Sequence, residues 1–170
     1  KILPLLPPKF VWIFSRRYIA GETLADAVTT TKKINSEGCM ATIDLLGEFV
    51  SNMDQAKKNC DQFLDIIDNI EKVRKSDGID TNYSIKPSMY GLLIDEEACC
   101  KYIRQIVEKA ASYNNYVRID MENSPCTTKT FNMYKKIKKE FPKSVGVAVQ
   151  AYLKRSNGDL EDLMSINDPE

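Results

Sequence analysis

The chain has 170 residues, of which 43% are apolar and 28% are charged, the balance of one globular domain with a sizeable core. Its 24 basic residues match its 24 acidic residues, so the formal net charge is zero. No cluster of Lys and Arg is long enough to follow a phosphate backbone, which excludes nucleic acid as an expected partner.

The content of cysteine and histidine limits the chemistry further. Five cysteines are present, an odd number, with no C-x-x-C pair and no histidine anywhere in the chain. This excludes a mixed Cys–His zinc site, and no metal is expected. We expect the cysteines to be small buried apolar residues in a reducing compartment. Without His, the Ser–His and Cys–His nucleophile pairs are excluded too, so acid–base chemistry would come from carboxylates, Lys or Tyr.

Residues 1–21 are predicted to be an apolar, proline-rich lead-in. Pro4, Pro7 and Pro8 interrupt the apolar run too often for a membrane-spanning helix, and the small-residue cleavage site of a signal peptide is missing. We expect an irregular segment that covers the bottom of a barrel, ahead of a domain that spans residues 22–170.

A helix is predicted first, over about residues 22–35. Thr23 is its expected N-cap, with Asp26 three residues later, and Gly38 ends it. The first strand follows over residues 40–46. A long helix then begins near Met53, and its apolar residues recur every three or four positions, the pattern of one buried stripe. That stripe consists of Met53, Ala56, Cys60, Phe63, Leu64, Ile67, Ile70 and Val73.

The rest of the chain repeats the order of strand, polar loop and helix. A polar return over residues 75–82 leads to a second strand over 83–87 and a helix that starts near residues 96–97. The third strand covers residues 116–121, and its helix opens at Ser124 and stops before Phe141. The fourth strand covers residues 145–151, and a short helix capped by Asn157 follows it. Three helix aromatics, Phe63, Tyr102 and Tyr134, are expected in the core.

Strands that alternate with helices predict parallel pairing through right-handed crossovers. An open doubly wound sheet and a barrel both fit this order. The absence of a G-x-G-x-x-G motif after the first strand weakens the dinucleotide-binding sheet. Polar residues inside the strands favour a barrel lumen, because an open sheet with both faces covered reads as continuous apolar runs. The predicted fold class is α/β, specifically the N-terminal half of a (β/α)8 barrel: four parallel βα units preceded by a helix.

In such a barrel, function gathers at the C-terminal ends of the strands. This rule selects a set of polar residues and one tyrosine: Asp44, Glu48, Lys86, Asp120, Glu122, Asn123, Gln150 and Tyr152. Lys86 and Asp120 carry most of the signal, because a lone buried charge is costly. Two interpretations stay open. Lys86, Asp44, Asp120 and Arg118 could pair among themselves as a polar plug, or Lys86 could face the carboxylate and Asp120 the amine of a zwitterion.

Five sequence blocks resemble the monofunctional proline dehydrogenase family, in the family's order. They are residues 18–23 (YIAGET), 43–50 (IDLLGEFV), 84–88 (SIKPS), 117–124 (VRIDMENS) and 147–155 (VAVQAYLKR), within a similarity that covers residues 16–164. The resemblance implies a (β/α)8 barrel with FAD over the strand ends, and oxidation of L-proline to Δ1-pyrroline-5-carboxylate in proline catabolism. The electrons would pass to a quinone or another acceptor.

The resemblance also implies roles for single residues. Lys86 would hold the substrate carboxylate, and Asp120 would belong to the substrate pocket. Gln150 is similar to the glutamine that hydrogen-bonds the flavin ring, and Met121 is assigned to the cofactor site with it. Arg118 and Tyr152 would shape the pocket. Such residues need only orient the substrate and tune the flavin, which supplies the redox chemistry.

The resemblance implies four further strands, which bring most of the FAD phosphate and adenine contacts, and a late helix whose paired arginines clamp the substrate carboxylate. We therefore expect the 170 residues alone to bind FAD weakly and not to turn over proline. A different barrel enzyme that uses Lys86 as a Schiff-base lysine, and a non-catalytic half-barrel that self-associates, are the alternatives. Members of the resembling family lie in the bacterial cytoplasm at the inner membrane face or in mitochondria, and with no targeting peptide visible we expect the cytoplasm. Peripheral contact with the inner membrane face and homo-oligomer formation stay open.

Overall fold

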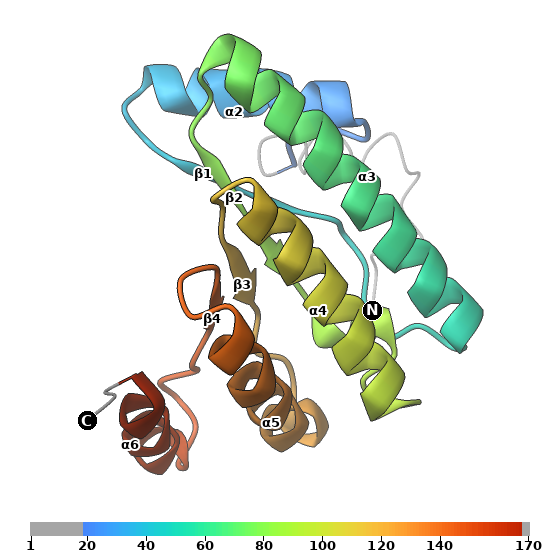
Figure 1. Ribbon diagram of the computed structural model, residues 1–170, viewed down its shortest axis with the longest axis vertical. Helices are drawn as coiled ribbons and strands as arrows, with labels where there is room; N and C mark the ends of the chain where they lie inside the picture. The colour runs from blue at the N-terminus through green and yellow to red at the C-terminus, as the bar shows by residue number, and fades with distance from the viewer. Residues whose placement is uncertain (1–18, 168–170) are drawn as a thin grey trace, which may run out of the picture. The chain divides into compact units, whose positions relative to one another are not determined.

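The computed structural model describes residues 19–167 (Figure 1). The N-terminal lead-in predicted over residues 1–21 lies almost wholly outside the described residues. Helices and strands alternate along the described chain in this order: α2 Leu24–Ser36, β1 Ala41–Asp44, α3 Met53–Asp77, β2 Thr81–Ile85, the 3-10 helix η2 Pro87–Tyr90, α4 Glu96–Ser112, β3 Val117–Ile119, α5 Ser124–Glu140, β4 Val145–Val147 and α6 Ser156–Asn167. No helix in the described part of the chain combines the length and apolar character needed to cross a bilayer.

The described residues form two compact units, one that includes residues up to Ala41 with Lys72–Thr81 and one that includes Thr42–Glu71 with the residues from Asn82 onward. In the first unit, α2 begins with the predicted capping box, in which Asp26 N donates to Thr23 Oγ1 and Thr23 N donates to Asp26 Oδ2. Asn35 at the other end of α2 donates to the carbonyl of Asp80 and accepts from its N–H, at 2.9 and 2.8 Å. These two bonds fasten the end of α2 to the segment that enters β2.

The sheet runs in the order β1-β2-β3-β4, and β2, β3 and β4 pair in parallel, as the alternation of strands and helices predicts. Ser84 lies opposite Arg118, which in turn lies opposite Gly146. Because side chains alternate between the faces of a strand, these three residues share one face. That face is polar, whereas Tyr83, Val117 and Val145 on the other face are buried.

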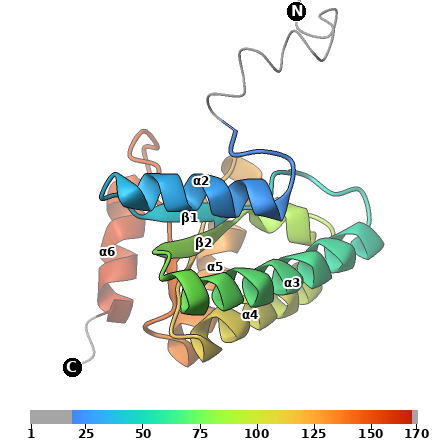
Figure 2. The same cartoon turned by 90° about the horizontal axis from the view of Figure 1, so that it is seen from above.

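In the second unit, the apolar stripes of α3, α4 and α5 form the core with the apolar face of the sheet. Figure 2 shows α3 and α4 side by side, and Cys60 Sγ of α3 donates to the carbonyl of Tyr102 on α4 at 3.7 Å. The fully buried large side chains include Phe63, Ile67, Ile103, Ile106 and Ile137. Burial of each such side chain contributes about 1.5–3 kcal/mol. The sheet therefore has one face packed by helices and one face lined by polar groups.

One member of the α3 stripe is a carboxylate. Glu71 is 1% exposed and lies four residues after Ile67 on the buried side of α3. It accepts hydrogen bonds from Tyr83 Oη at 2.9 Å and from Asn115 Nδ2 at 2.6 Å. A buried charge of this kind is tolerated because hydrogen bonds replace its hydration.

Helix α6 follows the last strand and contacts α5. Arg155 donates to Thr128 Oγ1 on α5 at 2.8 Å, and its guanidinium lies 5.9 Å from the centre of the Phe131 ring. Lys135 of α5 forms an ion pair with Asp162 of α6. Arg155 also pairs with Asp159 in the first turn of α6 at 2.7 Å, so this arginine links the start of α6 to α5.

Several sequence predictions need correction. Three strands are shorter than predicted: β1 ends at Asp44 rather than residue 46, β3 at Ile119 rather than residue 121, and β4 at Val147 rather than residue 151. The second strand has its predicted length but lies two residues earlier, over Thr81–Ile85 rather than 83–87. The predicted polar return over residues 75–82 is mostly regular structure, since α3 continues to Asp77 and β2 begins at Thr81. Basic residues in the last turn of α3 favour this extension, because they oppose the negative end of the helix dipole.

Three further predictions about single residues were wrong. Asn157 is not the cap of α6, because the helix already begins at Ser156, whose hydroxyl donates to the carbonyl of Gln150 at 2.5 Å. Tyr102 is only half-buried, whereas Phe63 and Tyr134 are core residues as predicted. Cys39 is exposed and Cys100 is half-buried, whereas Cys60, Cys99 and Cys126 are buried as predicted.

Candidate functional site

The predicted site residues lie at the C-terminal ends of the strands, on the polar side of the sheet. Asp44 is the last residue of β1, Lys86 directly follows β2, and Asp120 directly follows β3. Asp120 N still donates to the carbonyl of Ile85 at 2.9 Å, so the sheet ladder fixes the backbone at this point. Parallel strands bring these three charged side chains to the same edge of the sheet.

Lys86 and Asp44 form an ion pair across the ends of β1 and β2. Lys86 Nζ donates to Asp44 Oδ2 at 2.9 Å, and both side chains are less than a quarter exposed, at 23% and 22%. The other carboxylate oxygen, Asp44 Oδ1, is buried and has no hydrogen-bond partner among the described residues. A buried acceptor without a donor is rare and costly, which marks this position as one with unused binding capacity.

Arg118 and Asp120 form a second ion pair at the end of β3. Arg118 Nε donates to Asp120 Oδ1 at 2.7 Å, with side chains 46% and 21% exposed. The four charged residues thus pair as the polar-plug interpretation predicted. Each pair nevertheless leaves some donors and acceptors available, because an ammonium has three N–H donors, a guanidinium five, and a carboxylate two acceptor oxygens. The pairing is therefore compatible with a bound zwitterion.

Burial and the neighbouring charges set the protonation of this cluster. Burial raises the pKa of Asp44, and the hydrogen bond and charge of Lys86 act in the opposite direction. The hydrogen bond to Asp44 raises the pKa of Lys86, and the charges of Asp120 and Glu48 add to this effect. The hydrogen bond to Asp120 likewise raises the pKa of Arg118. Lys86 therefore stays a cation at neutral pH.

The two residues predicted to contact a cofactor follow the third and fourth strands. Gln150 is exposed, and its side-chain Nε2 donates to the backbone carbonyl of Met121 at 3.3 Å. The carbonyl of Gln150 accepts from the Ser156 hydroxyl, which fixes the backbone of this loop. The structure thus brings Gln150 and Met121 together, while their roles toward a cofactor stay predictions.

A further contact joins the loops after the second and third strands, and sequence reasoning missed it. Ser88 in η2 donates twice to Glu122, from Oγ to Oε1 at 2.5 Å and from the backbone N–H to Oε2 at 2.8 Å. The strand-end rule selected Glu122, but no spacing in the sequence indicates Ser88 as its partner.

The remaining candidates contribute less to the cluster. Glu48 is exposed and acts on Lys86 through charge alone. Tyr152 is 99% exposed, so within the described residues it lines no pocket wall. Asn123 is the N-cap of α5, although its side chain makes no capping hydrogen bond.

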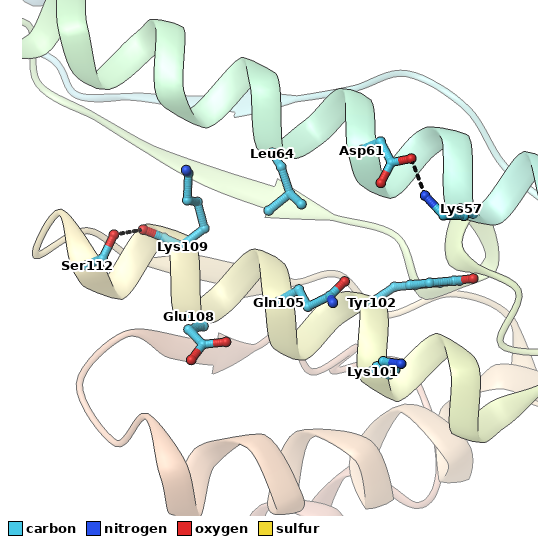
Figure 3. Close-up of a pocket in the computed structure, with 9 residues that line it drawn as sticks. All are labelled: Lys57, Asp61, Leu64, Lys101, Tyr102, Gln105, Glu108, Lys109 and Ser112. Atoms are coloured by element: carbon cyan, nitrogen blue, oxygen red, sulfur yellow. Dashed lines mark hydrogen bonds and ion pairs between the residues drawn. The ribbon is translucent and has the colours of Figure 1, made fainter.

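A cavity of about 590 Å³ lies elsewhere, between α3 and α4 (Figure 3). None of the strand-end residues contributes to it. It is lined by Lys57, Asp61, Leu64, Lys101, Tyr102, Gln105, Glu108, Lys109 and Ser112. Two of these, Lys57 and Asp61, already pair at 2.6 Å on the helix surface. The candidate site is therefore the charged cluster at the strand ends and not this surface cavity.

The sequence profile that describes proline dehydrogenases matches residues 27–168 of this chain, which includes every strand and the whole charged cluster. The chain belongs to the proline dehydrogenase family. The family predicted from the five sequence blocks is thereby confirmed.

Individual relatives agree with this family. The chain is 33% identical over 152 residues to proline dehydrogenase 1 of Bacillus subtilis subsp. natto, covering 89% of this chain and 49% of the relative. It is 30% identical over 160 residues to the proline dehydrogenase of Deinococcus radiodurans, covering 90% of this chain and 50% of the relative. The chain thus spans about half the length of the curated proline dehydrogenases it matches.

Solved structures show the same fold. Proline utilization A from Bdellovibrio bacteriovorus, in a form inactivated by N-propargylglycine, superposes with a TM-score of 0.78 at 19% identity. The match covers 87% of this chain and 18% of that protein. A mutant of proline utilization A from Bradyrhizobium japonicum gives a TM-score of 0.63 at 16% identity, covering 74% of this chain and 14% of that protein. The predicted α/β class and its (β/α)8 barrel type are confirmed.

Proposed function

We propose that this chain forms the first half of the catalytic barrel of an FAD-dependent proline dehydrogenase, which oxidises L-proline to Δ1-pyrroline-5-carboxylate in proline catabolism. The observation that carries the proposal is the charged cluster at the strand ends, where Lys86 pairs with Asp44 and Arg118 with Asp120. A cluster of cations and carboxylates suits an amino acid, whose two charges must be oriented together.

Lys86 and Asp120 are the residues we propose to bind the substrate. Lys86 uses one N–H donor for Asp44, which leaves donors for the carboxylate of proline. Asp120 uses Oδ1 for Arg118, so Oδ2 can accept from the substrate amine. Asp44 would keep Lys86 protonated, because the hydrogen bond between them raises the pKa of the lysine. Together these contacts would fix the substrate ring at the polar side of the sheet.

The side chains on this side of the sheet fit a flavin. Arg118 and Gln150 are hydrogen-bond donors at neighbouring strand ends, and a flavin ring offers carbonyl and ring-nitrogen acceptors. The Gln150 amide holds Met121 through a 3.3 Å bond, a long one that is easily exchanged for another acceptor. Gln150 and Met121 would therefore hold the ring of FAD, and FAD would supply the two-electron acceptor for the oxidation of proline.

The 170 residues alone are proposed to hold FAD weakly and not to turn over proline. The relatives are about twice as long as the matched segment, and four strands leave β1 and β4 as edges of a sheet that a barrel would close. The electron acceptor is proposed to be a quinone or another acceptor. Localisation in the cytoplasm, with or without contact at the inner membrane face, rests on the family resemblance.

Absorbance spectroscopy tests the proposal. The chain is incubated with FAD and desalted, alone and after co-expression with the C-terminal half of a full-length family member. We expect little flavin with the chain alone and, with the second half, retained flavin bands that L-proline bleaches and D-proline does not. A flavoprotein that L-proline fails to bleach would contradict the proposed substrate. Lys86→Met should keep the flavin and lose the response to L-proline, whereas Lys57→Met, on the outer helix surface, should keep both.

The alternative in which Lys86 forms a Schiff base is disfavoured by the ion pair. A Schiff-base lysine must react as the neutral amine, and Asp44 raises the pKa of Lys86. Borohydride trapping with carbonyl compounds should therefore leave Lys86 unmodified. Native mass measurement addresses the other alternative, since a self-associating half-barrel would appear as a dimer.

A further inference from the structure

Glu122 lies at a junction of the three loops that carry the charged cluster. It follows β3 and stands two residues after Asp120. Its carboxylate accepts from both the hydroxyl and the backbone N–H of Ser88, at 2.5 and 2.8 Å, in the turn after β2. Both oxygens of one carboxylate thus accept from Ser88, which connects the loop after β3 to the turn after β2.

Ser88 carries the connection on to the loop after β1. Its hydroxyl oxygen accepts from the N–H of Phe49 at 3.1 Å, and its carbonyl accepts from the N–H of Val50 at 3.4 Å. Ser88 is 3% exposed, so water does not compete for these bonds. The hydroxyl of Ser88 therefore bridges the Glu122 carboxylate and the Phe49 backbone.

The backbone at Phe49 is strained, and the connection to Ser88 lies next to this strained residue. Phe49 has a φ of 45°, a left-handed conformation that a bulky residue adopts only under constraint. Its side chain is 46% exposed, so packing covers it only in part. The hydrogen bonds from the N–H groups of Phe49 and Val50 to Ser88 help to hold the loop in this conformation.

The same turn fixes the backbone of Lys86. The carbonyl of Lys86 accepts from the N–H of Met89 at 3.0 Å and thereby starts η2, whose second residue is Ser88. A shift of η2 would move the point from which the Lys86 side chain reaches Asp44. Because Asp44 lies at the start of the loop that Ser88 anchors, both partners of the ion pair depend on one carboxylate.

We infer that Glu122 is a positioning residue that, through Ser88, sets the distance between Lys86 and Asp44 at the strand ends. The network and its effect on Lys86 are independent of the substrate. Its importance for binding proline rests on the proposed function.

Two measurements on the 170-residue chain test this inference. The first is the hydrogen-exchange rate of the amides of Phe49, Val50 and Ser88, which reports on the loop connection. The second is the rate at which acetic anhydride acetylates Lys86, measured by mass spectrometry, which reports on the ion pair with Asp44. Glu122→Gln leaves one acceptor oxygen for two donors. We expect exchange at these amides to rise about tenfold, as for loss of one charge-assisted hydrogen bond. Acetylation of Lys86 should rise several-fold, because its contact with Asp44 loosens.

Ser88→Ala is the second variant, since it removes only the bridging hydroxyl and keeps the Ser88 backbone. It should reproduce both effects at Phe49 and Lys86, even if Glu122→Gln folds poorly. Glu97→Gln is the matched control, because Glu97 is an exposed carboxylate in the first turn of α4. Faster amide exchange with acetylation of Lys86 no faster than in the control would overturn the inference, because Glu122 would then stabilise the loops without positioning the lysine. Bleaching of the flavin by L-proline tests the proposed function separately.

Discussion

Lys86 and Asp44 are separated by 42 residues in the chain, yet Lys86 Nζ lies 2.9 Å from Asp44 Oδ2 at the ends of neighbouring strands. The pair is unequal. The ion pair raises the pKa of Lys86 and so stabilises its charged form. The Asp44 carboxylate, by contrast, is partly buried, which raises its pKa, and its Oδ1 has no hydrogen-bond partner among the described residues. Removal of either member should therefore have different consequences.

Lys86→Met should destabilise the fold at neutral pH by about 1–3 kcal/mol, because it leaves the Asp44 carboxylate partly buried without its cation. Burial already raises the pKa of Asp44, and loss of Lys86 should raise it further. A raised pKa means that the folded state binds the proton more tightly than the unfolded state, so the variant's deficit should shrink as pH falls through that pKa. Urea unfolding at several pH values measures this. A deficit that grows toward acid pH would contradict the argument, and Asp44→Asn/Lys86→Met should recover part of the loss.

Tyr83→Phe should cost about 1–3 kcal/mol of stability, because it removes a donor from the buried carboxylate of Glu71. Tyr113→Phe is the matched control: the Tyr113 hydroxyl donates to Asp68 at 2.8 Å, where Asp68 is 33% exposed and water can replace the lost donor. The two variants are compared by urea unfolding. Equal losses would show that burial of Glu71 does not govern the cost.

Gly91→Ala should be among the most damaging single-methyl changes. Gly91 ends η2 with a φ of +86°, and an added Cβ would lie 2.5 Å from Met53 Sδ. The backbone alone costs roughly 1 kcal/mol and overpacking about 1–3 kcal/mol more. Gly78→Ala separates the two effects, because Gly78 has a φ of +68° but no atom within 4 Å of the added Cβ. In thermal unfolding, the midpoint temperature of Gly91→Ala should lie well below that of Gly78→Ala. Adding Met53→Ala to Gly91→Ala should restore only part of the lost stability.

The cysteines should differ sharply in reactivity. Burial raises the pKa of Cys60 to about 11 and raises that of Cys99 still further, so neither forms the reactive thiolate near neutral pH. Cys39 is exposed. At about pH 8, a disulfide reagent such as DTNB should titrate Cys39 quickly and reach Cys60 and Cys99 only after denaturation. Cys39→Ser should remove the fast phase, and a fast phase that persists in this variant would contradict the assignment.

The order of the fold could be predicted from the sequence because each helix carries its own signals. The start of α3 at Met53, the capping box at Thr23 and Asp26, and the end of α5 before Phe141 all follow from local patterns. The strand ends could not be predicted in this way. Whether residues 148–151 continue β4 depends on the partner strand, and β3 ends at Ile119.

The buried carboxylate of Glu71 could have been predicted from the helical pattern of the sequence, although it was not. The positions of the α3 stripe recur every three or four residues through Ile67 and Ile70, so position 71 also falls on the buried side. A charged residue at that position predicts a buried polar network, whose donors proved to be Tyr83 and Asn115. By contrast, the connection between Glu122, Ser88 and Phe49 joins three loops, and only the folded chain reveals it.

The sheet order has a consequence for synthesis of the chain. Because β1, β2, β3 and β4 are neighbours in space in the order in which they occur in the sequence, each strand pairs with the strand made just before it. No strand must wait for a distant partner to leave the ribosome, and each crossover closes a loop of modest length. Assembly can therefore follow translation from the N-terminus, one βα unit at a time. The polar groups at the strand ends would then be gathered one strand at a time, as each βα unit forms.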